Sequence, residues 1–194
     1  MVKYYAILLF AIFSLTSNAQ SFDAAGERKV NAIDRVIHLN EMQKGIIKRA
    51  YKRLLVMQDS AMNKVSDTER SFQIIYDAKH DFHNLFMGTL TTSQIVAYVK
   101  SVYKPEVNAK ASYYCSLLAD TGKYDELTVK EYKEKVSEYL MLEKIVYVRD
   151  KYDYARQKNN ISRLKALQPT CLKEALNLEK QKGLNKLRNG RIAW

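Results

Sequence analysis

Helix-breaking residues are rare in this sequence: its 194 residues include two prolines and six glycines. Lys, Glu, Leu, Ala, Met and Gln, which favour helices, are abundant instead. Apolar residues recur at steps of three and four, as in the series Ile47, Ala50, Leu54, Met57 and Ala61, and no segment alternates convincingly between apolar and polar residues as a strand would. We therefore expect an all-α fold, an antiparallel bundle of about six to eight helices.

The few breaking residues indicate where helices should end. A helix that starts near Thr91 should stop before Pro105, because proline has no N–H to donate. Gly122 should cap the C-terminus of the helix that follows. The other expected boundaries are the start of a long helix at Thr128, its end near Lys158, a break at Asn159–Asn160 and the start of a last helix near Pro169.

The first nineteen residues have the layout of a secretory signal peptide. Lys3 gives a positive start, residues 4–15 are almost entirely apolar, and Ser17-Asn18-Ala19 places small residues before a cleavage site. We expect cleavage before Gln20, which leaves residues 20–194 as a single helical domain with a C-terminal tail prone to fraying. An uncleaved membrane anchor is the alternative. No cysteine stands directly after the apolar run, where a lipid would be attached, so the expected location is periplasmic or secreted, without a lipid anchor.

The chain is basic, with a formal net charge of +11, and loss of Lys3 with the signal peptide would leave +10. In an exported protein such a charge suits anionic membrane surfaces, lipopolysaccharide or acidic unfolded chains rather than nucleic acid. The charge could also serve solubility alone.

Cys115 and Cys171 are the only cysteines. Exported proteins fold in an oxidising compartment, where two cysteines often pair, so we expect one disulfide between them. The alternative is two separate buried thiols. Zinc binding by these two residues alone is not expected, because the C-x-x-C spacing is missing.

Four helix starts carry the pattern of a capping box, in which a small polar side chain and a Gln or Glu three residues later bond to each other's backbone N–H groups. The expected pairs are Asn40 with Gln43, Ser66 with Glu69, Thr91 with Gln94 and Thr128 with Glu131. Three of them also have a leucine directly before the cap, at Leu39, Leu90 and Leu127.

These three starts resemble the LTxxQ signature of the Spy/CpxP family of periplasmic proteins. Residues 90–94 match it literally, whereas Asn40 stands for the threonine of the first motif and Glu131 for the glutamine of the third. The resemblance covers roughly residues 22–104, and residues 105–194 are extra. It implies a curved antiparallel helical dimer that acts as an ATP-independent chaperone or a stress-linked envelope regulator. Some relatives bind zinc, nickel or cobalt, and the motif residues are structural.

His80 and His83 are candidate metal ligands. The segment also holds Asp77, and imidazole with carboxylate is a suitable set for a divalent transition metal. A third or fourth ligand is not evident, and two histidines on a half-exposed helix are commonly plain surface residues.

Tyrosine is unusually frequent, with 14 in the chain, and many lie between residues 98 and 154. Tyr98, Tyr103, Tyr113 and Tyr114 are candidates for an adaptable binding surface, since tyrosine offers an apolar ring with a polar tip. They could equally be the edges of the core between helices.

No catalytic motif stands out: G-x-S-x-G, H-E-x-x-H and a glycine-rich phosphate loop are all missing. We expect no enzymatic activity and no cofactor. The favoured hypothesis is an envelope binding protein, a chaperone or stress-response module for protein clients. The alternatives are a periplasmic metal sensor or buffer, and a structural protein with one dedicated partner.

Overall fold

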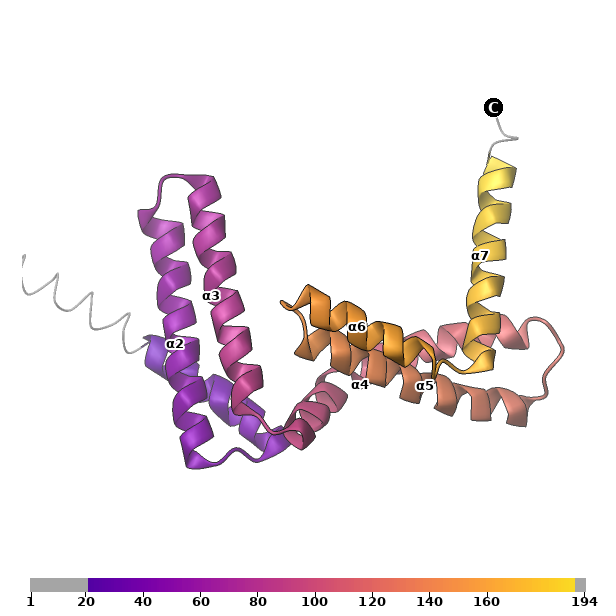
Figure 1. Cartoon of the computed structure of the whole chain (residues 1–194), viewed down its shortest axis with the longest axis horizontal. Coiled ribbons are helices and arrows are strands. Elements are labelled where there is room, and N and C mark those ends of the chain that lie inside the picture. Colours follow the sequence, from indigo (N-terminus) through magenta and orange to yellow (C-terminus); the bar gives the residue numbers. More distant parts are fainter. Residues whose placement is uncertain (1–20, 191–194) are drawn as a thin grey trace, which may run out of the picture. The chain divides into compact units, whose positions relative to one another are not determined.

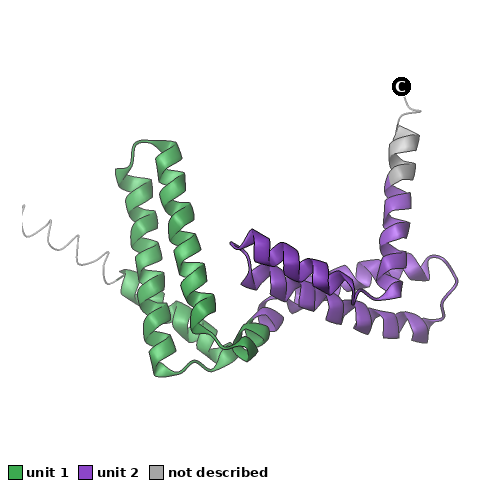
Figure 2. Ribbon diagram, viewed as in Figure 1, with its two compact units in different colours: residues 1–98 green, residues 99–194 purple. Residues whose placement is uncertain are grey.

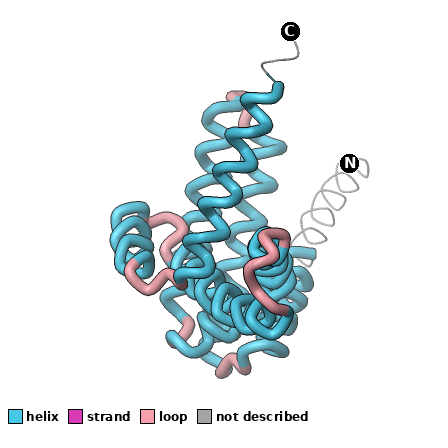
Figure 3. Tube along the Cα trace, turned by 90° about the vertical axis from the view of Figure 1, so that its right-hand side faces the viewer, coloured by secondary structure: helices cyan, strands magenta, loops and turns pink. Residues whose placement is uncertain are grey.

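The computed structural model describes residues 21–190, with side chains through residue 183, and all of its regular structure is helical (Figures 1 and 3). A helical segment at 21–37 is followed by six helices: α2 (Glu41–Lys64), α3 (Thr68–Thr89), α4 (Thr92–Ala119), α5 (Glu126–Arg149), α6 (Tyr154–Lys165) and α7 (Thr170–Gly190). The all-α prediction is therefore confirmed. The predicted signal peptide lies outside the described residues. Among the described helices, none is long and apolar enough to cross a membrane.

The chain divides into two compact units, residues 1–98 and 99–194, with the boundary inside α4 (Figure 2). The expectation of a single domain over residues 20–194 stays a prediction. In the first unit, α2 and α3 lie side by side as an antiparallel hairpin (Figure 1). The buried residues of the first unit include Val30, Ile33, Ile37, Leu39, Ile47, Leu54, Phe86 and Ile95.

The second unit has its own core, which forms between the C-terminal part of α4, α5 and the start of α7. The most deeply buried large side chains on these elements are Leu118, Val136 and Leu172. Ala111 and Ala175 are also fully buried, and their small side chains suit close approach of neighbouring helices.

Pro105 does not end a helix, contrary to the prediction: α4 continues through it from Thr92 to Ala119. A proline inside a helix costs about 3 kcal/mol, partly because the carbonyl four residues earlier loses its partner. Here Pro105 and Ser101 are both exposed, so water can bond to the freed Ser101 carbonyl. Val99 and Val107 are buried on either side and hold the two halves of the helix in place.

The prediction of one long helix over residues 128–158 is also wrong. α5 ends at Arg149, and α6 begins at Tyr154 and passes through Asn159 and Asn160 without a break. Two boundaries agree with expectation. Gly122 follows α4 with φ +67°, a left-handed conformation that glycine adopts readily, and α7 begins directly after Pro169.

Candidate functional site

The first candidate site is the N-terminus of α2, where a capping box forms. The Asn40 side chain accepts a hydrogen bond from the Gln43 N–H at 2.8 Å, and Gln43 Oε1 accepts one from the Asn40 N–H at 3.0 Å. Asn40 has extended backbone angles, which suit an N-cap. The preceding Leu39 is buried, so the motif anchors the helix start to the core.

The N-terminus of α4 forms a second box of the same kind. Thr91 Oγ1 accepts from the Gln94 N–H at 3.2 Å, and Gln94 Oε1 accepts from the Thr91 N–H at 3.0 Å. Leu90, directly before the cap, is buried as Leu39 is. The two motifs singled out in the sequence, 51 residues apart, therefore have the same local geometry.

The two boxes meet through their glutamines. Gln43 Nε2 donates to Gln94 Oε1 at 2.9 Å, and Gln94 Nε2 donates back to Gln43 Oε1 at 3.2 Å. Gln43 also donates to the Thr89 carbonyl, and Gln94 donates to the carbonyls of Ile37 and His38. This glutamine junction joins the ends of the segment 21–37 and α3 to the starts of α2 and α4. It consists of neutral amides and backbone groups, so its chemistry is structural.

The turn before Asn40 completes this junction. His38 has φ +50°, an uncommon conformation for a residue with a side chain. The Asp34 carboxylate accepts from the Leu39 N–H at 2.7 Å and pairs with Lys44 at 3.0 Å. The Lys44 contact, followed by the Leu39 hydrogen bond, lowers the pKa of Asp34 below its ordinary value.

The other two expected capping boxes are wrong, because an aspartate one residue after Ser66 and another three residues before Thr128 cap these helices instead. Asp67, not Ser66, accepts from the Arg70 N–H at the start of α3. Asp125, not Thr128, caps α5, and its side chain accepts a hydrogen bond from the Thr128 N–H. Aspartate is among the best N-cap residues, which explains both shifts. Neither Glu69 nor Glu131 is then placed to complete the expected box.

The structure does not assemble the predicted metal site. Within residues 21–183, no group of three or more His, Cys, Asp or Glu side chains is arranged to hold an ion. Asp77 and His83 are six residues apart and lie about 120° from each other around α3, so the three side chains do not converge on one point. Asp77 accepts from Gln73 Nε2, and the His80 ring contacts Asn84 at 3.0 Å.

The expected disulfide is not formed: Cys115 of α4 and Cys171 of α7 are both free and buried. This corresponds to the alternative of two separate thiols. Burial raises the pKa of both thiols, because the charged thiolate is disfavoured away from water. The folded protein therefore holds two thiols of low reactivity.

The four candidate tyrosines do not form one exposed surface. Tyr114 is buried, Tyr98 and Tyr103 are half-buried, and only Tyr113 is exposed, at 47%. Tyr98 packs edge-on against Phe86 at 5.2 Å, and Lys144 Nζ lies 4.3 Å from the centre of the Tyr103 ring. Three of the four rings are therefore at least partly packed, and a binding surface at these positions stays a prediction.

Sequence reasoning missed the exposed apolar side chains of the α2–α3 hairpin. Met62, at 73%, Phe72, at 67%, and Tyr76, at 55%, are among the most exposed large apolar residues described. They lie near the end of the hairpin where α2 turns into α3: Met62 and Phe72 directly follow Ala61 and Ser71, and Ser71 Oγ donates to the Ala61 carbonyl at 2.8 Å. Phe72 and Tyr76 are one turn apart and line a shallow open cleft. We name these three residues the hairpin patch.

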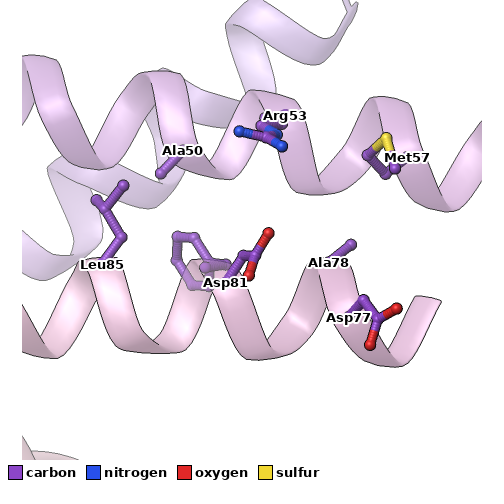
Figure 4. A pocket seen from close by; sticks show the side chains of 8 residues that line it. Ala50, Arg53, Met57, Asp77, Ala78, Asp81 and Leu85 are labelled. Atoms are coloured by element: carbon purple, nitrogen blue, oxygen red, sulfur yellow. The ribbon is translucent and has the colours of Figure 1, made fainter. Parts of the chain in front are cut away.

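A small cleft of about 90 Å³ also lies between α2 and α3 (Figure 4). Ala50, Met57, Ala78, Phe82 and Leu85 give it apolar walls. Arg53 faces Asp81 across it, and Asp77 lies further along α3. The cleft has room for a few water molecules or a short group, and its charged residues bear both signs.

Sequence reasoning also missed Asp150, a buried carboxylate between α5 and α6. Arg149 binds it with two hydrogen bonds of 2.8 Å, Asn160 of α6 donates at 2.8 Å, and Arg156 lies at 3.4 Å. Burial opposes the charge, but the bonds from Arg149 and Asn160 outweigh it and hold the pKa of Asp150 below its ordinary value. Asp150 follows the last residue of α5 and is bound by Asn160 of α6, while Asp153 caps the start of α6. These contacts explain why the chain turns after Arg149.

A last missed contact fixes the start of α7. The Tyr124 hydroxyl donates to Glu174 Oε2 at 2.6 Å, and its ring packs edge-on against Tyr132 at 5.2 Å. The bond to the carboxylate, followed by burial, raises the pKa of Tyr124 to about 12. The nearby Lys123 lies 3.5 Å from Glu174.

The fold and these sites define an all-α helical protein with a glutamine junction and an exposed apolar hairpin. Comparisons of the chain with protein-family models, curated proteins and solved structures found no match.

Proposed function

We propose that this chain is an exported envelope binding protein that captures protein clients without ATP, as a chaperone or stress-response module. The hairpin patch is the observation that carries the proposal. Three large apolar side chains, each more than half exposed, lie near the turn of a two-helix hairpin. A group of exposed apolar residues of this kind commonly marks a surface for a partner.

The chemistry of the hairpin patch favours adaptable binding. Met62 has a flexible, polarizable thioether that adjusts to differently shaped partners. Phe72 and Tyr76 supply aromatic rings, and the tyrosine adds a polar tip. Lys64 and Arg70 are exposed nearby and can contact acidic parts of an unfolded client.

Two features of the sequence support the cellular setting. The signal-like residues 1–19 suit export. The two LTxxQ-like starts resemble a periplasmic family of ATP-independent chaperones, and the glutamine junction gives both motifs a shared structural role at the base of the hairpin.

The test is light scattering by an aggregating client with and without purified protein. Wild type should suppress scattering, and M62Q/F72Q/Y76Q should lose most of that effect. The matched control V102Q/L127Q/L142Q replaces three exposed apolar residues of the second unit and should suppress scattering as wild type does. Equal suppression by wild type and the hairpin variant would refute the role of the patch.

The choice of clients separates a general chaperone from a protein with one dedicated partner. Several unrelated unfolded proteins should be suppressed with similar efficiency if the surface is adaptable. No suppression of any of them would favour the dedicated partner, with the hairpin patch as its binding surface.

A further inference from the structure

α6 is unlike the other described helices in burial and charge. None of its residues is buried, and its twelve residues include four basic side chains and no acidic one. Arg156 pairs with Asp150, whereas no carboxylate of the described part of the chain forms an ion pair with Lys158, Arg163 or Lys165. Nothing on the helix itself therefore neutralises its charge.

The underside of α6 is fixed to the second unit. Gln157, Asn160, Ile161 and Leu164 are half-buried and recur at steps of three and four, so they form one face. Asn160 donates to the Asp150 carboxylate, and Gln157 donates to the Asp150 carbonyl at 3.4 Å. The opposite face is thus held outward by the fold.

The outward face has an ordered layout. Its centre is a strip of small exposed residues, Ala155, Asn159, Ser162 and Ala166, again at steps of four and three. Arg156 and Arg163 line one side of the strip, and Lys158 and Lys165 line the other. One large apolar residue extends each side: Leu167, 71% exposed, beside the arginines and Tyr154, 75% exposed, beside the lysines.

We propose that α6 docks this protein on an anionic lipid surface. Short side chains along the centre allow the helix to approach closely, and cations on both sides can reach lipid phosphates at the same time. Tyr154 and Leu167 are suited to the boundary between headgroups and acyl chains. This convex helix matches a flat surface better than an acidic polypeptide, which would gain more contact in a groove. The inference does not depend on client binding by the hairpin patch.

The test is co-sedimentation of the full chain with vesicles of phosphatidylcholine, with or without phosphatidylglycerol. Any binding through the apolar residues 4–15 would be common to both vesicles, so the difference between them reports the anionic lipid. Each basic residue near such a surface contributes about 5-fold to the partition coefficient. K158Q/R163Q/K165Q should therefore weaken binding to the anionic vesicles on the order of 100-fold.

The matched control is R35Q/R49Q/K79Q, which removes the same number of charges from exposed positions of the segment 21–37, α2 and α3. It should weaken binding by less than about 3-fold, since those residues lie outside the docking face. N159E/S162E keeps every basic residue and adds two carboxylates to the central strip, so it should also weaken binding to the anionic vesicles, on the order of 25-fold.

Three results would overturn the proposal. One is equal binding to both kinds of vesicle. Another is an equal loss in the α6 variant and the control, which would mean that total charge alone matters. The third is α6-dependent binding to polyglutamate but not to the anionic vesicles, which would assign the surface to an acidic polypeptide.

Discussion

The glutamine junction should be worth several kcal/mol to the first unit. In Gln43→Ala, the Asn40 N–H and the Thr89 carbonyl lose their side-chain partner, and the two bonds to Gln94 are lost as well. Each polar group left unpaired at a largely buried position costs about 1–3 kcal/mol. Because Thr89 is only half-buried and water can reach it in part, we expect a loss of about 2–4 kcal/mol in the free energy of unfolding.

The Gln43–Gln94 pair can be isolated with a double-mutant cycle. Gln94→Ala alone should cost about 1–2 kcal/mol, because its other partners are more accessible to water. The double variant should lose less than the sum of the two, by about 1–2 kcal/mol, since the reciprocal hydrogen bonds are removed only once. Glu131→Ala is the matched control, because Glu131 has the same place in its motif but is exposed and completes no capping box.

Urea unfolding followed by circular dichroism measures these differences. If the two units unfold in separate transitions, the shift should be confined to one of them. A loss in Gln43→Ala no larger than in Glu131→Ala, or a coupling energy near zero, would refute the view that the two motifs stabilise each other.

Three further predictions concern single residues. Because the pKa of Asp150 is lower in the folded than in the unfolded state, its contribution to stability is complete above the unfolded pKa near 4 and should disappear as pH falls through the folded value. Asp150→Ala should remove this contribution and cost about 2–3 kcal/mol at neutral pH, since the arginines left behind still reach water; urea unfolding at several pH values measures both effects. His38→Gly should raise the free energy of unfolding by about 0.5–1 kcal/mol, because it removes a left-handed backbone cost of about 1–2 kcal/mol and the greater entropy of glycine in the unfolded chain offsets part of that gain. Thermal unfolding measures this, and a drop in melting temperature would contradict it. Cys115 and Cys171 should react slowly with a thiol reagent in the native protein and rapidly in urea without reductant, and two unreactive cysteines in urea would instead indicate a disulfide.

Local signals in the sequence predicted the capping boxes at Asn40 and Thr91 and the left-handed Gly122, because each depends on residues within one turn of the chain. They failed at α5, where Asp125, three residues before Thr128, caps the helix instead, in line with the stronger N-cap preference of aspartate over threonine. Pro105 failed for a different reason: the cost of proline in a helix depends on whether water reaches the freed carbonyl, which is a matter of tertiary exposure.

The candidate surfaces were harder to predict than the helices. Phe72, which the sequence did not single out, is 67% exposed, whereas the tyrosines expected at a surface are mostly packed. Apolar residues at steps of three and four predict a helix face but do not tell whether another helix covers it.

The sequence by itself determined the all-helical class, the identity of two helix caps and a basic chain with a signal-like start, since these follow from composition and from contacts within a few residues. The tertiary structure decided that the two glutamines meet across 51 residues, that Asp150 is buried, and that the hairpin patch and the outer face of α6 stay exposed. Those features arise from packing between segments far apart in the chain, and local propensity carries no information about which side of a helix finds a partner.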